Sequence, residues 1–204
     1  MNIFSLDFET TGLNPYLDNV IEVAIKKITG NTNYETLIRP PKLPPGLPKY
    51  VPPHIVNITG ITDDLIETSS IEVSEAVNKL VEYIEKNSNR GPIYIVSHNG
   101  TTFDFIILKR LIKQNNIPDR FSKRLRYIDT LLFAKMFLKE KHYRQKDLCK
   151  KYNIINDSEH RAMGDVNALE EIYIELCNEY TLKNDKKEGY YMNHPDEIIS
   201  ELMV

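Results

Sequence analysis

The chain has 204 residues, of which 41% are hydrophobic and 27% are charged, and its formal net charge is −3. This composition fits an ordinary globular domain that can bury a core without disulfides. No apolar run approaches a membrane span and the N-terminus lacks the pattern of a secretory signal, so we expect no membrane partner and an intracellular, cytoplasmic location, or a nuclear one if the source is eukaryotic or viral.

The first third of the chain predicts three antiparallel strands. Residues 3–8 alternate between apolar and polar side chains, as a strand with one polar face does. Residues 20–28 and 34–38 form the next two strands, and the short Thr29-Gly30-Asn31 segment predicts a hairpin-type turn between them. Short connections favour antiparallel pairing throughout this part.

A proline-rich stretch interrupts this pattern between Pro40 and Pro53. Seven of the eleven prolines lie there, which rules out a helix or a central strand. We interpret it as an extended surface loop, with a docking role for a partner as the alternative. Residues 74–86 follow as an amphipathic helix with one apolar face.

The second half alternates between strands and helices. The wholly apolar residues 93–96 predict a strand buried on both faces. We expect a further strand at 125–128 and helices at 105–112, 131–138, 144–151 and 162–180. The whole order predicts an α/β domain over residues 1–180, with a central mixed five-stranded sheet flanked by helices. Residues 181–204 would form a C-terminal tail, docked or partly disordered.

Basic residues are concentrated in one block of the sequence. Residues 109–156 carry 14 Lys and Arg against 4 Asp and Glu, whereas both flanking segments are acidic. A local positive surface suffices to bind a phosphate backbone, whatever the charge of the whole chain. The alternative, solvated helix faces, is the better interpretation for Lys135, Lys139, Lys146 and Lys150.

Asp7 and Glu9 are the first candidates for chemistry. They lie two residues apart on the first strand, so both side chains leave the same face. Two neighbouring carboxylates repel each other unless a cation lies between them, and hard oxygen ligands suit Mg²⁺ or Mn²⁺. Two solvated acids on an exposed strand are the alternative, which the apolar Phe4, Leu6 and Phe8 on the opposite face disfavour.

Three further residues extend this set. Asp104 would be an ordinary helix N-cap, except that it follows a buried strand and a small polar turn. His160 and Asp165 lie five residues apart at the start of the last long helix, so Asp165 could point into a site while His160 stays on the loop. A water molecule activated by a divalent metal needs a base of near-neutral pKa, which histidine supplies.

These motifs, in the segments 4–13, 97–104 and 160–165, resemble those of the DEDDh (DnaQ-like) 3′–5′ exonuclease family, which has an RNase H-like fold. The Glu-Thr-Thr-Gly-Leu sequence of the first motif is most similar to TREX-type and proofreading-subunit exonucleases. A tyrosine-type member would carry tyrosine where Arg161 stands, so the resemblance is to the histidine type.

The resemblance implies an enzyme that releases nucleoside 5′-monophosphates from the 3′ end of a nucleic acid. Asp7, Glu9, Asp104 and Asp165 would hold two Mg²⁺ (or Mn²⁺) ions, and His160 would be the general base. It favours single-stranded DNA over RNA and a role such as DNA repair. A homodimer and a polymerase or other protein partner are also compatible with it. Implied substrate-binding residues are Thr10, Thr11, Gly12, Leu13, Ile61, Asn99, Lys109 and Arg110.

Three other functions compete with this one. An exoribonuclease of the same family would share the metal chemistry. A haloacid-dehalogenase-like phosphatase is suggested by Asp7-x-Glu9-x-Thr11, but that chemistry uses two aspartates and leaves Asp104 and His160 unexplained. A non-catalytic nucleic-acid-binding or polymerase-associated module with the same fold would not be expected to retain all five site residues.

Overall fold

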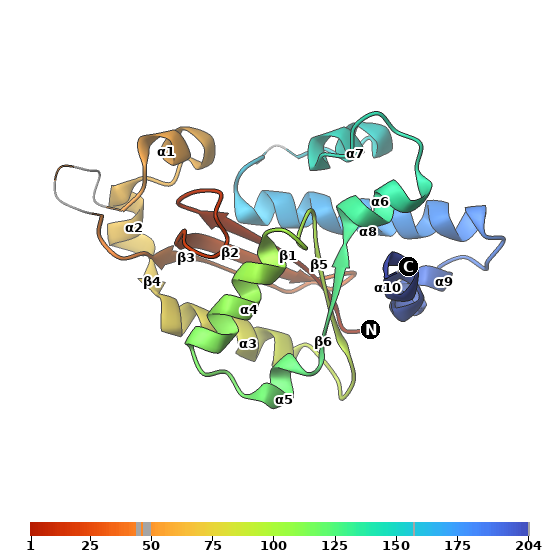
Figure 1. The fold of residues 1–204 in the computed structure, drawn as a ribbon, viewed down its shortest axis with the longest axis horizontal. Coiled ribbons are helices and arrows are strands. Elements are labelled where there is room, and N and C mark those ends of the chain that lie inside the picture. Colours follow the sequence, from red (N-terminus) through yellow and green to blue (C-terminus); the bar gives the residue numbers. More distant parts are fainter. Residues whose placement is uncertain (44–45, 47–49, 157, 204) are drawn as a thin grey trace.

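The structure is a computed structural model, and it describes residues 1–43, 46, 50–156 and 158–203. The predicted loop between Pro40 and Pro53 therefore lies partly outside the described residues. Six strands form one sheet in the order β4-β3-β2-β1-β5-β6 (Figure 1). They are β1 (Ile3–Thr10), β2 (Val20–Lys27), β3 (Asn33–Arg39), β4 (Ile71–Glu72), β5 (Ile93–Ser97) and β6 (Leu125–Asp129).

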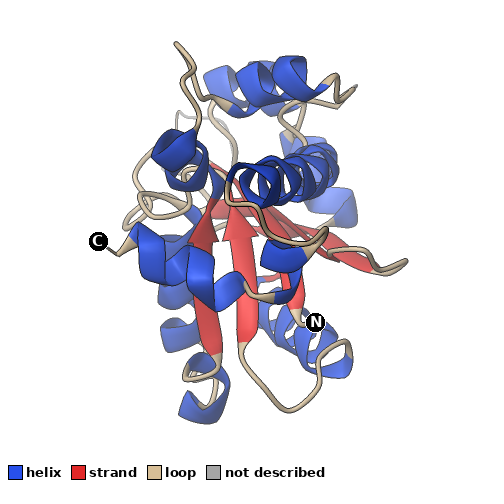
Figure 2. Cartoon of the chain, turned by 90° about the vertical axis from the view of Figure 1, so that its right-hand side faces the viewer, coloured by secondary structure: helices blue, strands red, loops and turns tan. Residues whose placement is uncertain are grey.

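Helices cover both faces of this sheet, as Figure 2 shows in a view turned by 90°. The helices are α1 (Pro53–Thr59), α2 (Asp63–Ser69), α3 (Val73–Lys86), α4 (Asp104–Gln114), α5 (Asp119–Ser122), α6 (Thr130–Phe137), α7 (Gln145–Tyr152), α8 (Ala162–Lys183), α9 (Tyr190–Asn193) and α10 (Pro195–Leu202). None of these described helices is long and apolar enough to cross a membrane.

The mixed sheet and its flanking helices confirm the predicted α/β architecture. Strands β1, β2 and β3 pair antiparallel, and β5 and β6 continue the sheet parallel to β1. The predicted strand number of five was too low by one. The sixth strand, β4, has only two residues and pairs with the end of β3 at Ile38 and Arg39. Two residues are too few for any alternating pattern in the sequence.

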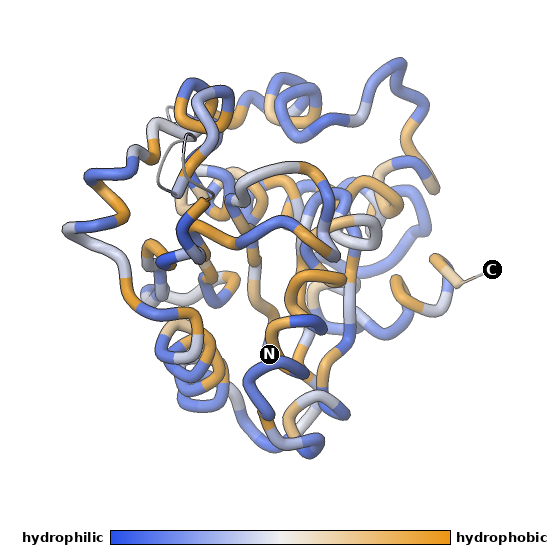
Figure 3. Tube along the Cα trace, turned by 60° about the vertical axis from the view of Figure 1, so that its left-hand side comes forward, coloured by the Kyte–Doolittle hydropathy of each residue, from blue (hydrophilic) through white to orange (hydrophobic). Residues whose placement is uncertain are grey.

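The core consists of two main layers, one on each face of the sheet. Phe4, Leu6 and Phe8 of β1 pack with α3 and α4 on one side. Ile3 packs on the other side with residues of α6, α7 and α8. In Figure 3 the hydrophobic stretches run mainly through the middle of the molecule, while many outer turns are hydrophilic. The alternation of β1 therefore leaves one strand face for apolar packing and frees the other for polar groups near its end.

Short helices account for most of what the sequence analysis missed. Helices α1 and α2 have seven residues each, α5 and α9 four, too few for a helical period to stand out. The last helix, α10, packs in the same cluster as α6 and α8, where Ile198 is 0% exposed. Tyr94 of β5 donates a hydrogen bond to Asp196 at 2.7 Å, which joins α10 to the sheet.

We expect Ile198→Ala to lower the free energy of unfolding by about 2–4 kcal/mol, because it leaves a cavity between α10 and the sheet. Urea denaturation followed by circular dichroism measures this change. Ile199→Ala is the matched control, since Ile199 is only partly buried and its truncation should cost less. Equal losses in both variants would contradict a docked α10.

Candidate metal and catalytic site

The site forms where two neighbouring strands of the sheet separate. Strand β1 pairs with β5 only from Ile3 to Ser5, although β1 continues to Thr10. The last hydrogen bond across this boundary joins the hydroxyl of Ser97 to the carbonyl of Leu6 at 2.8 Å. The carboxyl end of β1 thus lies between an antiparallel and a parallel neighbour, and α/β sheets bind ligands at such points.

Asp7 and Glu9 lie on the face of β1 that α8 covers. They alternate with Leu6 and Phe8, which pack against the opposite helical layer. Ala24 of β2 is opposite Asp7 in the strand register, and Ala162 and Val166 of α8 pack on it. These small side chains let the first turn of α8 approach the sheet closely.

Asp165 in that first turn completes a cluster of three acids. Ligand oxygens of Asp7, Glu9 and Asp165 all lie within 4.8 Å of one another. Asn156 donates to Asp165 at 2.8 Å, the backbone N–H of His160 at 3.0 Å, and Gln145 at a longer 3.4 Å. Because its hydrogen bonds come from the protein, Asp165 is held in one orientation. The sequence analysis missed Asn156 and Gln145, for which the sequence carries no signal.

Asp104 forms the buried wall beside this cluster. It is the first residue of α4 and only 4% exposed, and its Oδ1 accepts a hydrogen bond from the backbone N–H of Phe8 at 3.2 Å. That bond fixes it to β1 between Asp7 and Glu9. Burial is the main cause of the raised pKa of Asp7, and the charge of Asp104 adds to it.

Burial raises the pKa of all four acids in the site, and repulsion by the other site acids adds to this for Asp7 and Glu9. The pKa of Asp7 lies well above its usual value because of burial and the charges of Asp104, Glu9 and Asp165. Burial together with Asp165 raises the pKa of Glu9 to about 8. Burial raises the pKa of Asp104 to about 7, and burial also raises that of Asp165. Perturbed carboxyl groups gathered in one place are a hallmark of functional sites.

His160 lies on the rim of the site. Its imidazole is exposed, and Nε2 lies 3.8 Å from a carboxylate oxygen of Glu159. Its backbone is in the left-handed region with φ of 67°, which is uncommon for a residue other than glycine. The structure therefore brings the His160 backbone to Asp165 but leaves its ring outside the three-acid cluster.

The turn after β1 is tightly cross-linked and presents Leu13 to solvent. The hydroxyl of Thr10 donates to the carbonyl of Gly12 at 2.5 Å, and the hydroxyl of Thr11 accepts from the backbone N–H of Asn19 at 3.0 Å. A side chain at Gly12 would collide with the Asp18 carboxylate. Leu13, which is 91% exposed, is thus available to a ligand, whereas Thr10 and Thr11 are buried supports of the turn.

The remaining predicted substrate-binding residues fall into two groups. Ile61 is fully buried in the α1–α2 cluster, so it is a core residue and offers no surface to a substrate. Arg110 is half-buried and donates to the carbonyl of Asp18 at 2.7 Å, which anchors the β1–β2 turn. Lys109 is exposed, with its ammonium 4.5 Å from the centre of the Tyr127 ring, and Asn99 is exposed with φ of 61°.

Asp129 is a structural residue that the sequence analysis missed. At the end of β6 it caps α6 and also accepts hydrogen bonds from the backbone N–H groups of Asn99 and Thr101, both at 2.9 Å. It thereby fixes the turn that leads into Asp104. An aspartate between a predicted strand and a predicted helix is the signal that could have revealed its capping role.

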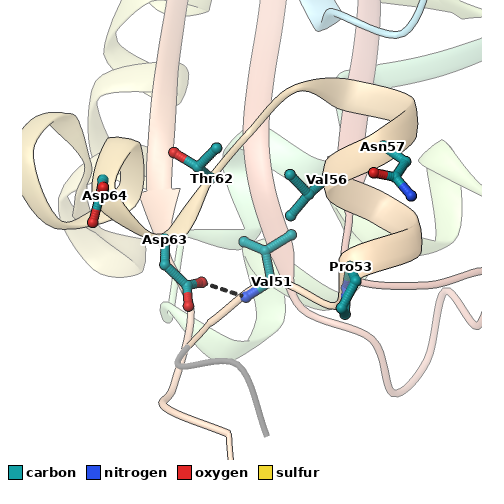
Figure 4. A pocket seen from close by; sticks show the side chains of 7 residues that line it. All are labelled: Val51, Pro53, Val56, Asn57, Thr62, Asp63 and Asp64. Carbon is teal, nitrogen blue, oxygen red and sulfur yellow. Dashed lines mark hydrogen bonds between the residues drawn. The ribbon is translucent and has the colours of Figure 1, made fainter.

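A separate hollow lies between α1 and α2 and shares no residue with the acidic cluster. Figure 4 shows its lining, with Asp63 accepting a hydrogen bond from the backbone N–H of Val51 at 2.9 Å. Val56 and Asn57 form its other wall. The Asp63 carboxylate is thus tied to the local backbone, and Asp64 is exposed.

The acidic cluster fits a hard divalent cation. It offers only carboxylate oxygens at mutual distances suited to a shared ion, and these are the ligands that Mg²⁺ and Mn²⁺ prefer. Burial, and after it repulsion by neighbouring carboxylates, raises the pKa of Asp7 and Glu9, so their ionised forms are costly without a cation. A bound cation would remove this repulsion.

We expect the metal-free protein to lose stability as the pH rises. The site carboxyl groups have raised pKa values, about 7 for Asp104 and about 8 for Glu9, so the folded state binds more protons than the unfolded chain and stability falls through that range. Asp7→Asn should reduce the fall in melting temperature between about pH 5.5 and 8.5 in chelator. Mn²⁺ should raise the wild-type melting temperature more at the higher pH. Identical pH profiles for wild type and variant would contradict this.

Comparison with known proteins agrees with this geometry. An exonuclease family model, RNase_T, matches residues 4–173. The PolC-type DNA polymerase III of Thermotoga maritima is 31% identical over 172 residues, which cover 83% of this chain and 11% of the polymerase. That of Pediococcus pentosaceus is 31% identical over 196 residues, 94% of this chain and 12% of the polymerase. The chain thus spans only a small part of these relatives.

Solved structures show the same fold at low sequence identity. Exonuclease I, in a structure that addresses its processivity, superposes with a TM-score of 0.69 at 20% identity and covers 86% of this chain and 40% of its own. The E. coli enzyme in complex with a dT13 oligonucleotide gives 0.67 at 19%, with coverage of 84% and 40%. With the match of the family model to most of its length and the acidic site described above, the chain belongs to the RNase T-type exonucleases, within the DEDDh (DnaQ-like) 3′–5′ exonuclease family.

Proposed function

We propose that the chain is a metal-dependent 3′–5′ exonuclease that releases nucleoside 5′-monophosphates from the 3′ end of single-stranded DNA. The observation that carries this proposal is the convergence of Asp7, Glu9 and Asp165 within 4.8 Å, with Asp104 bound to the backbone of Phe8 between the first two. Family membership supports the reaction class. It also disfavours the phosphatase alternative, which would not use Asp104 or His160.

Four carboxylates would hold two Mg²⁺ or Mn²⁺ ions. Bound there, such ions would supply Lewis acidity for an in-line displacement. This acidity would activate the attacking water oxygen and stabilise the charge on the leaving oxygen. Asp165 is oriented for this by Asn156, and Asp104 by the backbone of β1. The protein's own contribution is thus a set of oxygen ligands that needs little rearrangement.

His160 would be the general base. Attack of a water oxygen on the terminal phosphorus forms one P–O bond and breaks the bond to the 3′ oxygen of the preceding nucleotide. The proton from the attacking water goes to the imidazole, and the departing 3′ oxygen takes up a proton from solvent water. Because the ring lies on the rim near Glu159, it has to turn towards the acids when substrate is present. Its exposure leaves room for that rotation.

The preference for DNA rests on the relatives. PolC-type sequences are DNA polymerases, and exonuclease I has been crystallised with the single strand dT13. We extend the proposal to a proofreading or repair role beside a polymerase, because this chain is similar to a segment that makes up 11% of the PolC-type polymerase. An exoribonuclease of the same family is the alternative that the next experiment separates.

We expect Asp7→Asn and Asp165→Asn to abolish cleavage while the fold is retained, because each change removes a ligand charge and keeps the side-chain volume. The measurement is digestion of matched 5′-labelled DNA and RNA oligomers with Mg²⁺, Mn²⁺ or chelator. Asp64→Asn, at an exposed position of α2, is the matched control and should cleave normally. Wild-type activity in either site variant would refute the assignment, and an RNA-only ladder would select the exoribonuclease.

Lysines of α4 should contribute to strand binding. We expect Lys109→Ala and Lys113→Ala each to reduce the salt slope of log KM by about one, as loss of one phosphate contact does. Lys79→Ala on α3 is the control, because that lysine is paired with Glu75 at 2.7 Å. Arg110 is unsuitable for this test, since its removal would also release the β1–β2 turn. An unaltered slope would show that the basic block does not contact the substrate.

A further inference from the structure

Glu22 of β2 forms a fork-shaped ion pair with Arg161, which directly follows His160. Arg161 Nη2 lies 2.7 Å from Oε1 of Glu22, and Nε lies 3.2 Å from both carboxylate oxygens. The backbone N–H of Ala162 donates to Oε2 at 2.9 Å. Glu22 is 5% exposed, so one buried carboxylate holds both the side chain and the backbone at the start of α8.

The Glu22 carboxylate lies where its negative charge costs free energy. In the strand register Glu22 is directly opposite Glu9, and like charges opposite each other in a sheet are destabilising. Its charge contributes to the raised pKa of both Glu9 and Asp7. A buried ion pair also adds little stability relative to apolar side chains of similar size. The bond to the Ala162 N–H helps to cap α8, so the ion pair with Arg161 is the part of this arrangement that stability explains least.

The pair does have a geometric effect, because it fixes the segment that carries His160. The left-handed backbone of His160 costs free energy and persists only where the surroundings determine it. On one side of it Asp165 accepts from the His160 N–H at 3.0 Å, and on the other Glu22 holds Arg161. The segment also packs closely on α8, since a side chain at Gly164 would collide with the carbonyl oxygen of Ser158.

We propose that Glu22 and Arg161 form a positioning clamp that sets where the imidazole of His160 can reach, and through it the rate of the exonuclease reaction. This inference rests on the proposed function. Neither residue reacts; both act through His160. A lysine in place of Arg161 would keep the charge near Glu9 but lose the planar fork that binds two carboxylate oxygens at once.

A competing role for Arg161 is a direct contact with the substrate phosphate, since its side chain is 44% exposed. The two roles differ in what they change. A phosphate contact affects substrate binding and operates whether or not His160 is present. A clamp affects the chemical step and has nothing to position once the imidazole is removed.

The test is a double-mutant cycle in Arg161→Lys, Glu22→Gln and His160→Ala, with kcat and KM measured on a labelled oligomer and single-turnover rates for the slow variants. We expect Arg161→Lys and Glu22→Gln each to lower kcat by about 10- to 100-fold, the scale of a misplaced catalytic group, with KM changed less than about twofold. In the His160→Ala background the same changes should cause no further loss. Arg39→Lys, at an arginine paired with Glu72 at the sheet edge, is the control.

Several results would overturn the clamp. These are full kcat in both clamp variants, the same fold loss with and without His160, or a loss confined to KM, which would instead assign Arg161 to the phosphate. Melting temperature and Mn²⁺ titration calorimetry show whether each variant is folded and keeps its metal site. If Glu22→Gln fails to fold, the kcat of Arg161→Lys with and without His160 decides whether the clamp exists. A wild-type protein without exonuclease activity would refute the proposed function itself, which is a different outcome.

Discussion

Repulsion between carboxylates on one face of the sheet is the constraint on which the rest of the structure depends. Asp7 lies at its centre, since the charges of Asp104, Glu9, Asp165 and Glu22 all act on it. Packing alone would never collect so many acids at the end of a buried strand, because each carboxyl group is desolvated and near others of the same sign. The free energy for assembling them has to come from elsewhere, and the two apolar layers on either side of the sheet supply it.

The fold meets this constraint through close approach and backbone hydrogen bonds. Ala24 and Ala162 let α8 approach β2 without a large side chain between them, which brings Asp165 to the acids of β1. The buried carboxylate of Asp104 is satisfied by the backbone N–H of Phe8, and that of Asp129 by the turn before α4. Asp104 and Asp165 therefore keep their places through contacts that do not depend on a bound ion, and such preorganisation is what catalysis by charge stabilisation requires.

The sequence predicted the parts of this arrangement that depend on local pattern. Strand β1 and helix α3 carry a hydrophobic period, β5 is marked by an unbroken apolar run, and the spacing of Asp7 and Glu9 follows directly from strand geometry. Contacts between distant segments carried no such signal. The bond from Arg161 to Glu22 joins residues 139 positions apart. A glutamate within an apolar strand is as compatible with a solvated position at a sheet edge as with a buried ion pair. Ile61 shows the reverse error, since resemblance suggested a ligand contact where packing made a core residue.

The position of His160 shows why a fixed backbone and a free side chain are compatible. An imidazole that stayed within the acidic cluster would compete with cations for the carboxylate oxygens, whereas an imidazole on the rim can exchange protons with solvent between reactions. As the proposed general base, such a ring needs a narrow range of motion, because a proton acceptor has to come within hydrogen-bond reach of the water molecule. The backbone N–H of His160 donates to Asp165, and that of Ala162, at the start of α8, donates to Glu22. These two hydrogen bonds fix the pivot of that motion. The left-handed conformation of His160 is thus explained by the two anchors that enclose it, and the cost of Glu22 beside Glu9 is explained by the anchor it provides.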